Sequence, residues 1–269
     1  MLTKFIELLQ YRELVWNFVV RDLKVRYKHS ILGFAWTLLN PLGMMAIFTV
    51  VFTVMLPYAS VEKYPFFLLC ALLPWNFFSN SVLSSMYSVV GNAFLIKKVY
   101  FPREVLPLSA VFSNLIHFLL ALPVLFLLMI VMKVAITPWA LLLPVMIVVQ
   151  VIFTIGLAMV LSTLNVLYRD TPMIMEVVLL VWFFLTPVFY PMEVLPQSRL
   201  LWGMVLDVRR LVYILNPMAS IIASYRVILY HGAPPAFDFL SRTAVTALAL
   251  LVVGYLFFSR YSRTFPEEM

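Results

Sequence analysis

Long stretches of the chain contain no charged residue, and these stretches predict helices that cross a membrane. No Asp, Glu, Lys or Arg occurs within four intervals, His29–Val61, Tyr64–Ile96, Val105–Met132 and Val134–Tyr168. Each interval exceeds the roughly 20 apolar residues that a helix needs to cross about 30 Å of hydrocarbon. We therefore predict spans at about residues 32–56, 65–90, 106–132 and 138–164.

Two further apolar stretches complete the predicted architecture. A fifth span is expected at about residues 172–190, with Glu176 as its only charge, and a sixth at about 241–259. The stretch Leu211–Tyr225 is too short to span, and Asn216-Pro217 interrupts it where a proline breaks the helical hydrogen-bond ladder. We expect a re-entrant or interfacial element there. The predicted fold class is an all-α integral membrane protein with six transmembrane helices.

The composition agrees with a membrane location and narrows the chemistry. Hydrophobic residues make up 64% of the 269 residues and charged residues only 12%, whereas about a quarter of a soluble domain is charged. Cys70 is the only cysteine, so an intramolecular disulfide or a cysteine-based metal cluster is excluded. Lysine and arginine concentrate before residue 29 and between residues 97 and 103, which places both termini in the cytoplasm by the positive-inside rule. We expect residue 1 to be the mature start, and the net charge of +7 needs no nucleic acid to explain it.

The segment Trp16–Lys28 has the pattern of an amphipathic helix. Trp16, Val20, Leu23 and Tyr27 recur at helical spacing, and Arg21, Lys24 and Lys28 form a separate basic stripe. Such a helix is expected in the cytoplasmic headgroup layer. It is either a simple anchor or a helix that meets a phosphate-bearing lipid or a partner subunit, with Arg21, Arg26 and Lys28 as the phosphate contacts.

The loop Gly91–Leu108 mixes paired charges with aromatic residues. Tyr100, Phe101, Arg103 and Glu104 are typical of a docking surface for a soluble partner. The alternative is a basic topology anchor, for which Lys97 and Lys98 alone would suffice.

Proline-rich sequence and scattered polar residues mark two further candidate regions. The outer segment Thr186–Arg242 is expected to dip into the membrane and line a pathway or gate. The polar residues noted inside the predicted spans are Asn114, His117, Gln150, Asn165 and Glu176. We expect His117 to be a hydrogen-bonded packing residue and Glu176 to be satisfied near the cytoplasmic end, and we assign no metal.

Enzymatic motifs are absent from the sequence. It contains no Walker A run, no GxGxxG, no HExxH and no paired carboxylates in a charged loop. A pump built from this chain must therefore obtain its ATPase from another protein.

Together, these segments resemble the permease subunits of type-2 ATP-binding cassette exporters for bacterial O-antigen, capsule and teichoic acid. The resemblance covers most of residues 12 to 260 and rests on four blocks in the order of the family. They are RDLKVRYKHSILGFAWTLLNPL (Arg21–Leu42), NAFLIKKVYFPREVLPL (Asn92–Leu108), LYRDTP (Leu167–Pro172), and TPVFYPMEVLP followed by NPMASIIASYR.

The resemblance implies a homodimer in the bacterial inner membrane, with two copies of a cytoplasmic ATPase subunit that binds ATP and Mg. Residues 1–30 would be the interface-helix region, 31–260 the membrane domain and 261–269 a cytoplasmic tail. The interface helix would present Trp16, Arg21, Lys24, Arg26, Tyr27 and Lys28. The coupling helix would present Lys97, Lys98, Tyr100, Phe101, Pro102, Arg103 and Glu104. Channel or gate residues would include Trp36, Phe183, Phe184, Tyr190, Asn216 and Pro217.

The substrate implied is a lipid-linked polysaccharide resembling O-antigen. The main alternative is an exporter of a drug or small lipid. A second alternative is a proton-driven transporter using Glu176 and His117, which would need several intramembrane acids. A third is a membrane enzyme acting on polyprenyl lipids, which would need a cluster of Asp, Glu, His or Arg in a cytoplasmic loop, where this chain offers only Arg103 and Glu104 with two lysines.

Overall fold

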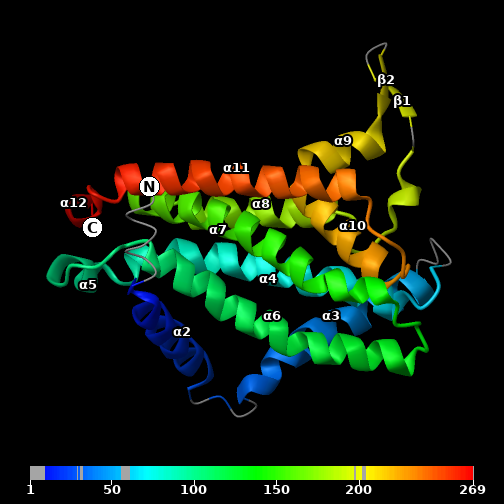
Figure 1. Ribbon diagram of the computed structural model, residues 1–269, viewed down its shortest axis with the longest axis horizontal. Helices are drawn as coiled ribbons and strands as arrows, with labels where there is room; N and C mark the ends of the chain where they lie inside the picture. Colours follow the sequence, from blue (N-terminus) through cyan, green and yellow to red (C-terminus); the bar gives the residue numbers. More distant parts are fainter. Residues whose placement is uncertain are drawn as a thin grey trace.

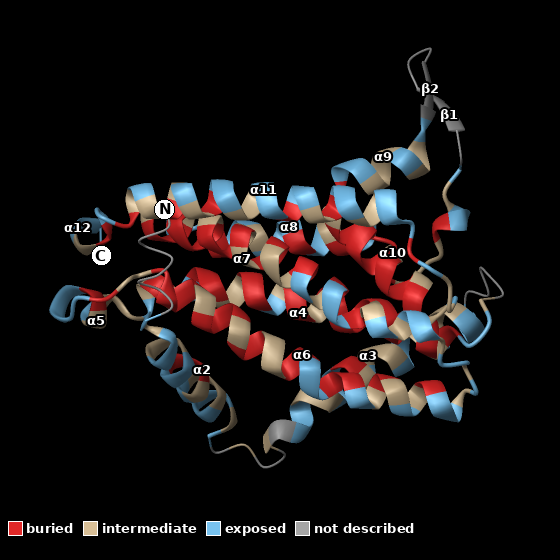
Figure 2. Cartoon of the chain, viewed as in Figure 1, coloured by how far each residue is buried: buried red, intermediate tan, exposed pale blue. Residues whose placement is uncertain are grey.

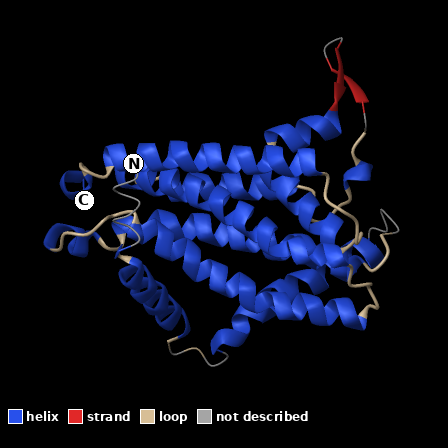
Figure 3. Cartoon of the chain, viewed as in Figure 1, coloured by secondary structure: helices blue, strands red, loops and turns tan. Residues whose placement is uncertain are grey.

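The computed structural model describes residues 10–28, 30, 33–55, 61–196, 198–201 and 204–268, and most of these are helical (Figure 3). The longer helices are α2 (Arg12–Tyr27), α3 (Trp36–Val50), α4 (Tyr64–Val90), α6 (Val105–Val131), α7 (Leu143–Leu167), α8 (Thr171–Leu185), α10 (Pro217–Leu229) and α11 (Phe237–Tyr261). The shorter ones are α5 (Ala93–Lys98), α9 (Val208–Leu215) and α12 (Phe265–Glu268). The predicted all-α class is confirmed. Residues 1–9 of the predicted interface region, 32 and 56 of the first span, and 269 of the tail lie outside the described residues.

Five helices in the described part of the chain are long and apolar enough to cross a bilayer. They cover Trp36–Met55, Tyr64–Val90, Val105–Val131, Pro138–Leu167 and Phe237–Tyr261. Their bounds agree closely with the predicted spans one, two, three, four and six. A charge-free run of this length is most stable as a helix across the bilayer, where its backbone groups are all hydrogen bonded within the helix.

The fifth predicted span is shorter than expected. α8 ends at Leu185, since Thr186 precedes Pro187 and adopts an extended ψ of 133°. Its 15 residues reach about 22 Å at 1.5 Å per residue, less than the ~30 Å hydrocarbon thickness.

The outer segment folds into a hairpin and a bent helix pair. Strands β1 (Ser198–Leu201) and β2 (Met204–Asp207) pair antiparallel, which the sequence analysis did not predict. α9 and α10 then meet at a bend of 104° at Asn216-Pro217, the break that we expected. Asn216 caps α10 by accepting a hydrogen bond from the Ala219 amide at 3.2 Å. The predicted re-entrant element therefore corresponds to a sharply bent pair.

α4, α6, α7, α8 and α11 run roughly along the longest axis of the molecule, whereas α2 and α10 lie oblique to it (Figure 1). α5 and α12 lie at one end, and α9, α10 and the hairpin lie at the other. α4 packs against α3, α6, α7, α8 and α10 and is the most buried of the five membrane-length helices, whereas little of α3 and α11 is buried. The exposed face of α11 is visible in Figure 2. Exposed side chains such as Leu127, Ile130 and Val253 are apolar, as a lipid-facing surface requires.

Candidate functional site

Hydrogen bonds fasten the loop between α4 and α6 to both α4 and α2. The Asn92 side chain precedes α5 and donates from Nδ2 to the Ser88 carbonyl of α4 at 2.7 Å. Its Oδ1 accepts a hydrogen bond from Nη1 of Arg21, on α2, at 2.9 Å. The Asn92 side chain thus connects the start of α5 to both α4 and α2. A displacement of α5 would therefore act on α2 as well as on α4.

The aromatic residues of this loop divide into an exposed group and a buried group. Tyr100 is 88% exposed and Phe94 is 72% exposed, whereas Phe101 is only 7% exposed. The Phe101 ring packs 6.2 Å from the ring of Phe18 on α2. Lys98 places its Nζ 4.1 Å from the centre of the Phe94 ring, a cation–π contact. The loop therefore presents Phe94 and Tyr100 outward and uses Phe101 as an anchor.

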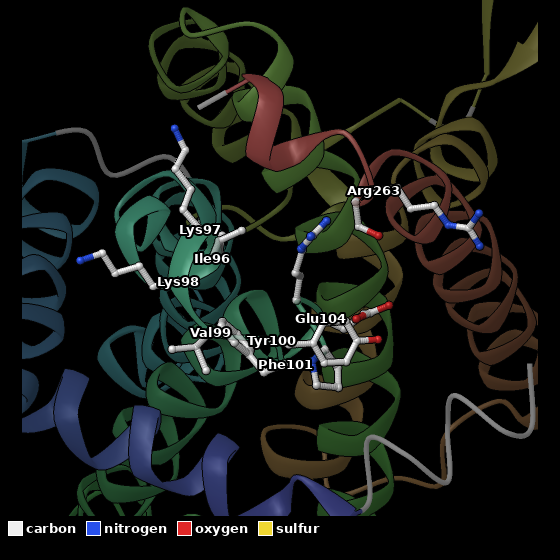
Figure 4. Close-up of a pocket in the computed structure, with 11 residues that line it drawn as sticks. Ile96, Lys97, Lys98, Val99, Tyr100, Phe101, Glu104 and Arg263 are labelled. Atoms are coloured by element: carbon white, nitrogen blue, oxygen red, sulfur yellow. The ribbon is translucent and has the colours of Figure 1, made fainter.

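A cavity of about 600 Å³ lies beside this loop, and we call it the docking cavity. Residues 96–104 line one side, and Ser262 and Arg263 after α11 line another (Figure 4). Its lining includes Lys97, Lys98, Arg103 and Arg263. The predicted coupling residues are thus brought together, and the net charge around the cavity is positive.

The contribution of the C-terminal segment was not predicted. α12 lies against α5, and the buried Phe265 ring packs 5.4 Å from Phe258 of α11. The only signal in the sequence was the basic pair Arg260 and Arg263.

The predicted interface-helix residues have different surroundings. α2 buries Phe18 and Val19, neither of which the predicted apolar face contained. Lys24 and Lys28 are exposed, as is Trp16, at 59%. Arg21 pairs with Asp22 at 2.9 Å.

Arg26 and Tyr27, at the end of α2, line a second cavity of about 420 Å³, which we call the polar cavity. Arg26 donates from Nη1 to Asn114 Oδ1 at 3.2 Å. The Tyr27 hydroxyl is hydrogen bonded to Thr37 and to His117. Helices α3, α4 and α6 supply the rest of the polar lining, which includes Asn40, Asn76 and Asn80.

These three asparagines were not among the predicted candidates, and two of the polar residues that were, Gln150 and Asn165, have a packing role instead. Gln150 donates to the Pro74 carbonyl at 2.7 Å, and Asn165 donates to the Met86 carbonyl at 2.8 Å. His117 is hydrogen bonded to Tyr27 at 2.9 Å, as expected. Glu176 is exposed on α8, and Arg169, which precedes α8, donates to the Glu268 carbonyl. The missed signal was the four-residue spacing of Asn76 and Asn80.

At the opposite end of the molecule, a buried arginine organises the turn that follows α8. Arg226, on α10, is 6% exposed and donates to the carbonyls of Pro187 and Val188. Its guanidinium carbon lies 3.6 Å from the centre of the Phe67 ring. The arginine thus fixes α10, the turn and the start of α4 relative to one another.

The predicted gate residues surround this turn. Phe183 is buried against Trp75 at 5.4 Å, whereas Phe184 is 54% exposed. Asn216, which precedes Pro217, accepts a hydrogen bond from Trp182 Nε1 at 2.7 Å. Tyr190 donates to the Phe184 carbonyl at 3.2 Å. Trp36, by contrast, lines the polar cavity.

Comparisons with known proteins agree over nearly the whole chain. A family model described as ABC-2 type transporter matches residues 13–230. The O-antigen export system permease protein RfbA of Myxococcus xanthus is 38% identical over 259 residues, which are 94% of this chain and 95% of that protein. Two proteins of the same name from Klebsiella pneumoniae are 33% and 34% identical, each over 92% of this chain and 91% of its own length. The chain belongs to the ABC-2 type transporter family.

Proposed function

We propose that the chain is the membrane-spanning permease subunit of an ATP-driven exporter that moves a lipid-linked, O-antigen-like polysaccharide across the bacterial inner membrane. The observation that carries this proposal is the near full-length similarity to three proteins named as O-antigen export permeases. All three carry the same name, so the drug or small-lipid alternative is not favoured.

A cytoplasmic ATP-binding cassette subunit is the proposed partner, and we propose that it binds at the docking cavity. Exposed aromatic rings beside several cations are what a protein interface uses as anchors. Tyr100 and Arg103 line the cavity, and Phe94 supplies a second exposed ring, on α5, in contact with Lys98. Both termini are proposed to lie on this cytoplasmic side, where α12 meets α5.

The loop is built to transmit a displacement from such a partner. It connects α4 directly to α6, two helices that pack against each other, and Asn92 links it to Arg21 of α2. Closure of the ATPase subunits on ATP would move α5, and α4, α6 and α2 would follow it as a unit. ATP then favours one of two permease states because the partner binds that state more tightly.

A second copy of the chain is the proposed partner within the membrane. Glu176 is exposed on α8, and its neighbours Val177 and Leu180 are exposed as well. A carboxylate facing hydrocarbon is costly, so this face is better suited to a water-containing pathway between two subunits than to lipid.

Substitution of Tyr100 tests the proposed docking role. Tyr100→Ala removes a ring that is almost fully exposed, so the fold should persist while co-purification with the ATP-binding cassette subunit and polysaccharide export both fall at least about tenfold, the effect of one interface anchor. The matched control is Phe237→Ala, which removes an exposed ring at the start of α11, away from the docking cavity. If Tyr100→Ala co-purified with the ATP-binding cassette subunit and exported polysaccharide as the wild type does, the proposed binding of that subunit at Tyr100 would be wrong.

A further inference from the structure

Three amide side chains in the polar cavity make no hydrogen bond within the part of the chain that the structure describes. They belong to Asn40 of α3 and to Asn76 and Asn80 of α4. Asn76 and Asn80 are one helical turn apart and so share a face of α4. α4 is otherwise deeply buried, yet Asn80 is exposed and Asn76 is only partly buried.

Three other amides in the membrane-length helices α6 and α7 are hydrogen bonded. Gln150 and Asn165 donate to backbone carbonyls, and Asn114 donates to Ser84 Oγ at 2.7 Å. An amide without a partner in hydrocarbon costs several kcal/mol. The three open amides therefore require a polar occupant, and they surround one shared cavity rather than being scattered over the surface.

The rest of the lining forms a preorganised wall. Asn114 accepts a hydrogen bond from Arg26 at 3.2 Å and also donates to the Ala110 carbonyl at 2.8 Å. Arg26 has five N–H donors, and its side chain stays exposed at the cavity. Trp36, also in the lining, is 55% exposed and offers a free aromatic face.

The chemistry of these groups indicates the class of ligand. A side-chain amide both donates and accepts, which matches a hydroxyl group, and a guanidinium matches a phosphate oxygen. A volume of about 420 Å³ lies within the range of about 300–1,000 Å³ for small-molecule sites. We infer that the polar cavity binds the sugar–phosphate headgroup of a lipid-linked glycan, an inference that rests on the proposed function.

The cavity offers more open amides than cationic side chains, and this favours a sugar-bearing headgroup over an ordinary phospholipid. Arg26 is the one Lys or Arg side chain in the described lining, while three open amides face the cavity. A phosphate without a sugar only accepts hydrogen bonds, so it would leave the amide oxygens without a donor. Hydroxyls attached to the same phosphate would pair the amides and the guanidinium together.

Binding to the full chain, purified with its ATP-binding cassette subunit, tests this inference. The probes are a polyprenyl pyrophosphate carrying one N-acetylhexosamine, the same polyprenyl pyrophosphate without sugar, and phosphatidylglycerol, each measured by native mass spectrometry. Asn76→Leu and Asn80→Leu should each weaken binding of the sugar-bearing probe about tenfold, the effect of one lost hydrogen bond, and leave the sugar-free probe unchanged. Arg26→Gln should weaken both pyrophosphate probes.

Two controls separate a ligand site from a structural role. Asn76→Leu and Asn80→Leu should not lower the thermal midpoint, because neither side chain has a hydrogen bond to lose within the described residues. Asn17→Leu, an exposed amide on α2 outside the polar cavity, should bind all three probes as the wild type does.

The outcomes distinguish this inference from the proposed function. Wild-type binding of the sugar-bearing probe by both asparagine variants would overturn the inference while leaving the export function standing. Weakened binding of phosphatidylglycerol alone would overturn it too, by identifying a membrane phospholipid as the occupant. A wild-type complex that neither binds the sugar-bearing probe nor exports polysaccharide would instead contradict the proposed function.

Discussion

Gly156 of α7 and Gly254 of α11 meet where the two helices cross. A Cβ placed on Gly254 would lie 2.2 Å from the carbonyl oxygen of Gly156, and a Cβ on Gly156 would lie 2.7 Å from the backbone of Leu250. Backbone atoms cannot move aside as a flexible side chain can. The pair therefore sets the separation of the two helices, as small residues do in membrane helix packing.

Gly254→Ala should destabilise the protein by about 1–3 kcal/mol or more, because the added methyl forces α7 and α11 apart. Thermal unfolding in detergent, followed by fluorescence-detected size exclusion, measures the effect as a lower midpoint. Gly43→Ala is the matched control, since a Cβ on Gly43 of α3 meets nothing within 4 Å. Equal midpoints for the two variants would show that the crossing tolerates the methyl group.

Arg226→Lys should destabilise the turn after α8. An ammonium cannot reproduce the separate Nη1 and Nη2 donors that now reach Pro187 and Val188. A buried carbonyl that loses its partner costs about 1–3 kcal/mol, so the thermal midpoint should fall clearly. Export should fall with it, because the turn carries Phe189 and Tyr190, whose rings lie 5.0 Å apart.

The control for this substitution is Arg242→Lys. Arg242 is exposed and makes one long hydrogen bond to the Tyr213 carbonyl at 3.4 Å, so its loss should cost little. A midpoint for Arg226→Lys as high as that of Arg242→Lys would contradict the bracing role of Arg226.

The sequence predicts the parts of this fold that depend on length and polarity. Five spans follow from charge-free runs, and the bend between α9 and α10 follows from Asn216-Pro217. Contacts between distant residues do not follow in this way. Gly156 and Gly254 are two of several glycines in the sequence, and only the crossing of α7 and α11 singles them out. The hairpin before α9 also escaped prediction, because its strands are only four residues each.

In the candidate sites, too, the sequence predicts features that depend on local polarity but not those that depend on contacts between distant residues. The loop between α4 and α6 was singled out by its charges and rings, but Tyr100 and Phe101 are adjacent aromatics in a segment too short for any periodicity. Only the position of Phe18 on α2 decides which ring is buried. Asn40 and Asn80 are likewise far apart in the chain, so the polar cavity becomes visible only when α3, α4 and α6 are packed.

Phe101→Ala should destabilise the chain by about 3 kcal/mol, the usual cost of emptying a buried phenylalanine site. The Phe101 ring is 7% exposed and belongs to the cluster that contains Phe18, Ile96 and Phe258. Tyr100→Ala, one residue earlier, should keep the wild-type thermal midpoint. Equal midpoints for the two variants would contradict the division of the loop into an outward ring and an anchor.

A buried polar chain links three helices and provides the last prediction. Tyr225 of α10 donates to Gln150 Oε1 at 2.8 Å, and Gln150 of α7 donates to the Pro74 carbonyl of α4 at 2.7 Å. Tyr225→Phe leaves an amide oxygen unpaired and Gln150→Leu leaves a hydroxyl unpaired, so each should cost about 1–3 kcal/mol. The double variant removes both partners and should cost less than the sum, with a coupling of about 1 kcal/mol. Midpoints of the wild type, both single variants and the double variant measure this coupling. Strict additivity would show that the two side chains do not depend on each other.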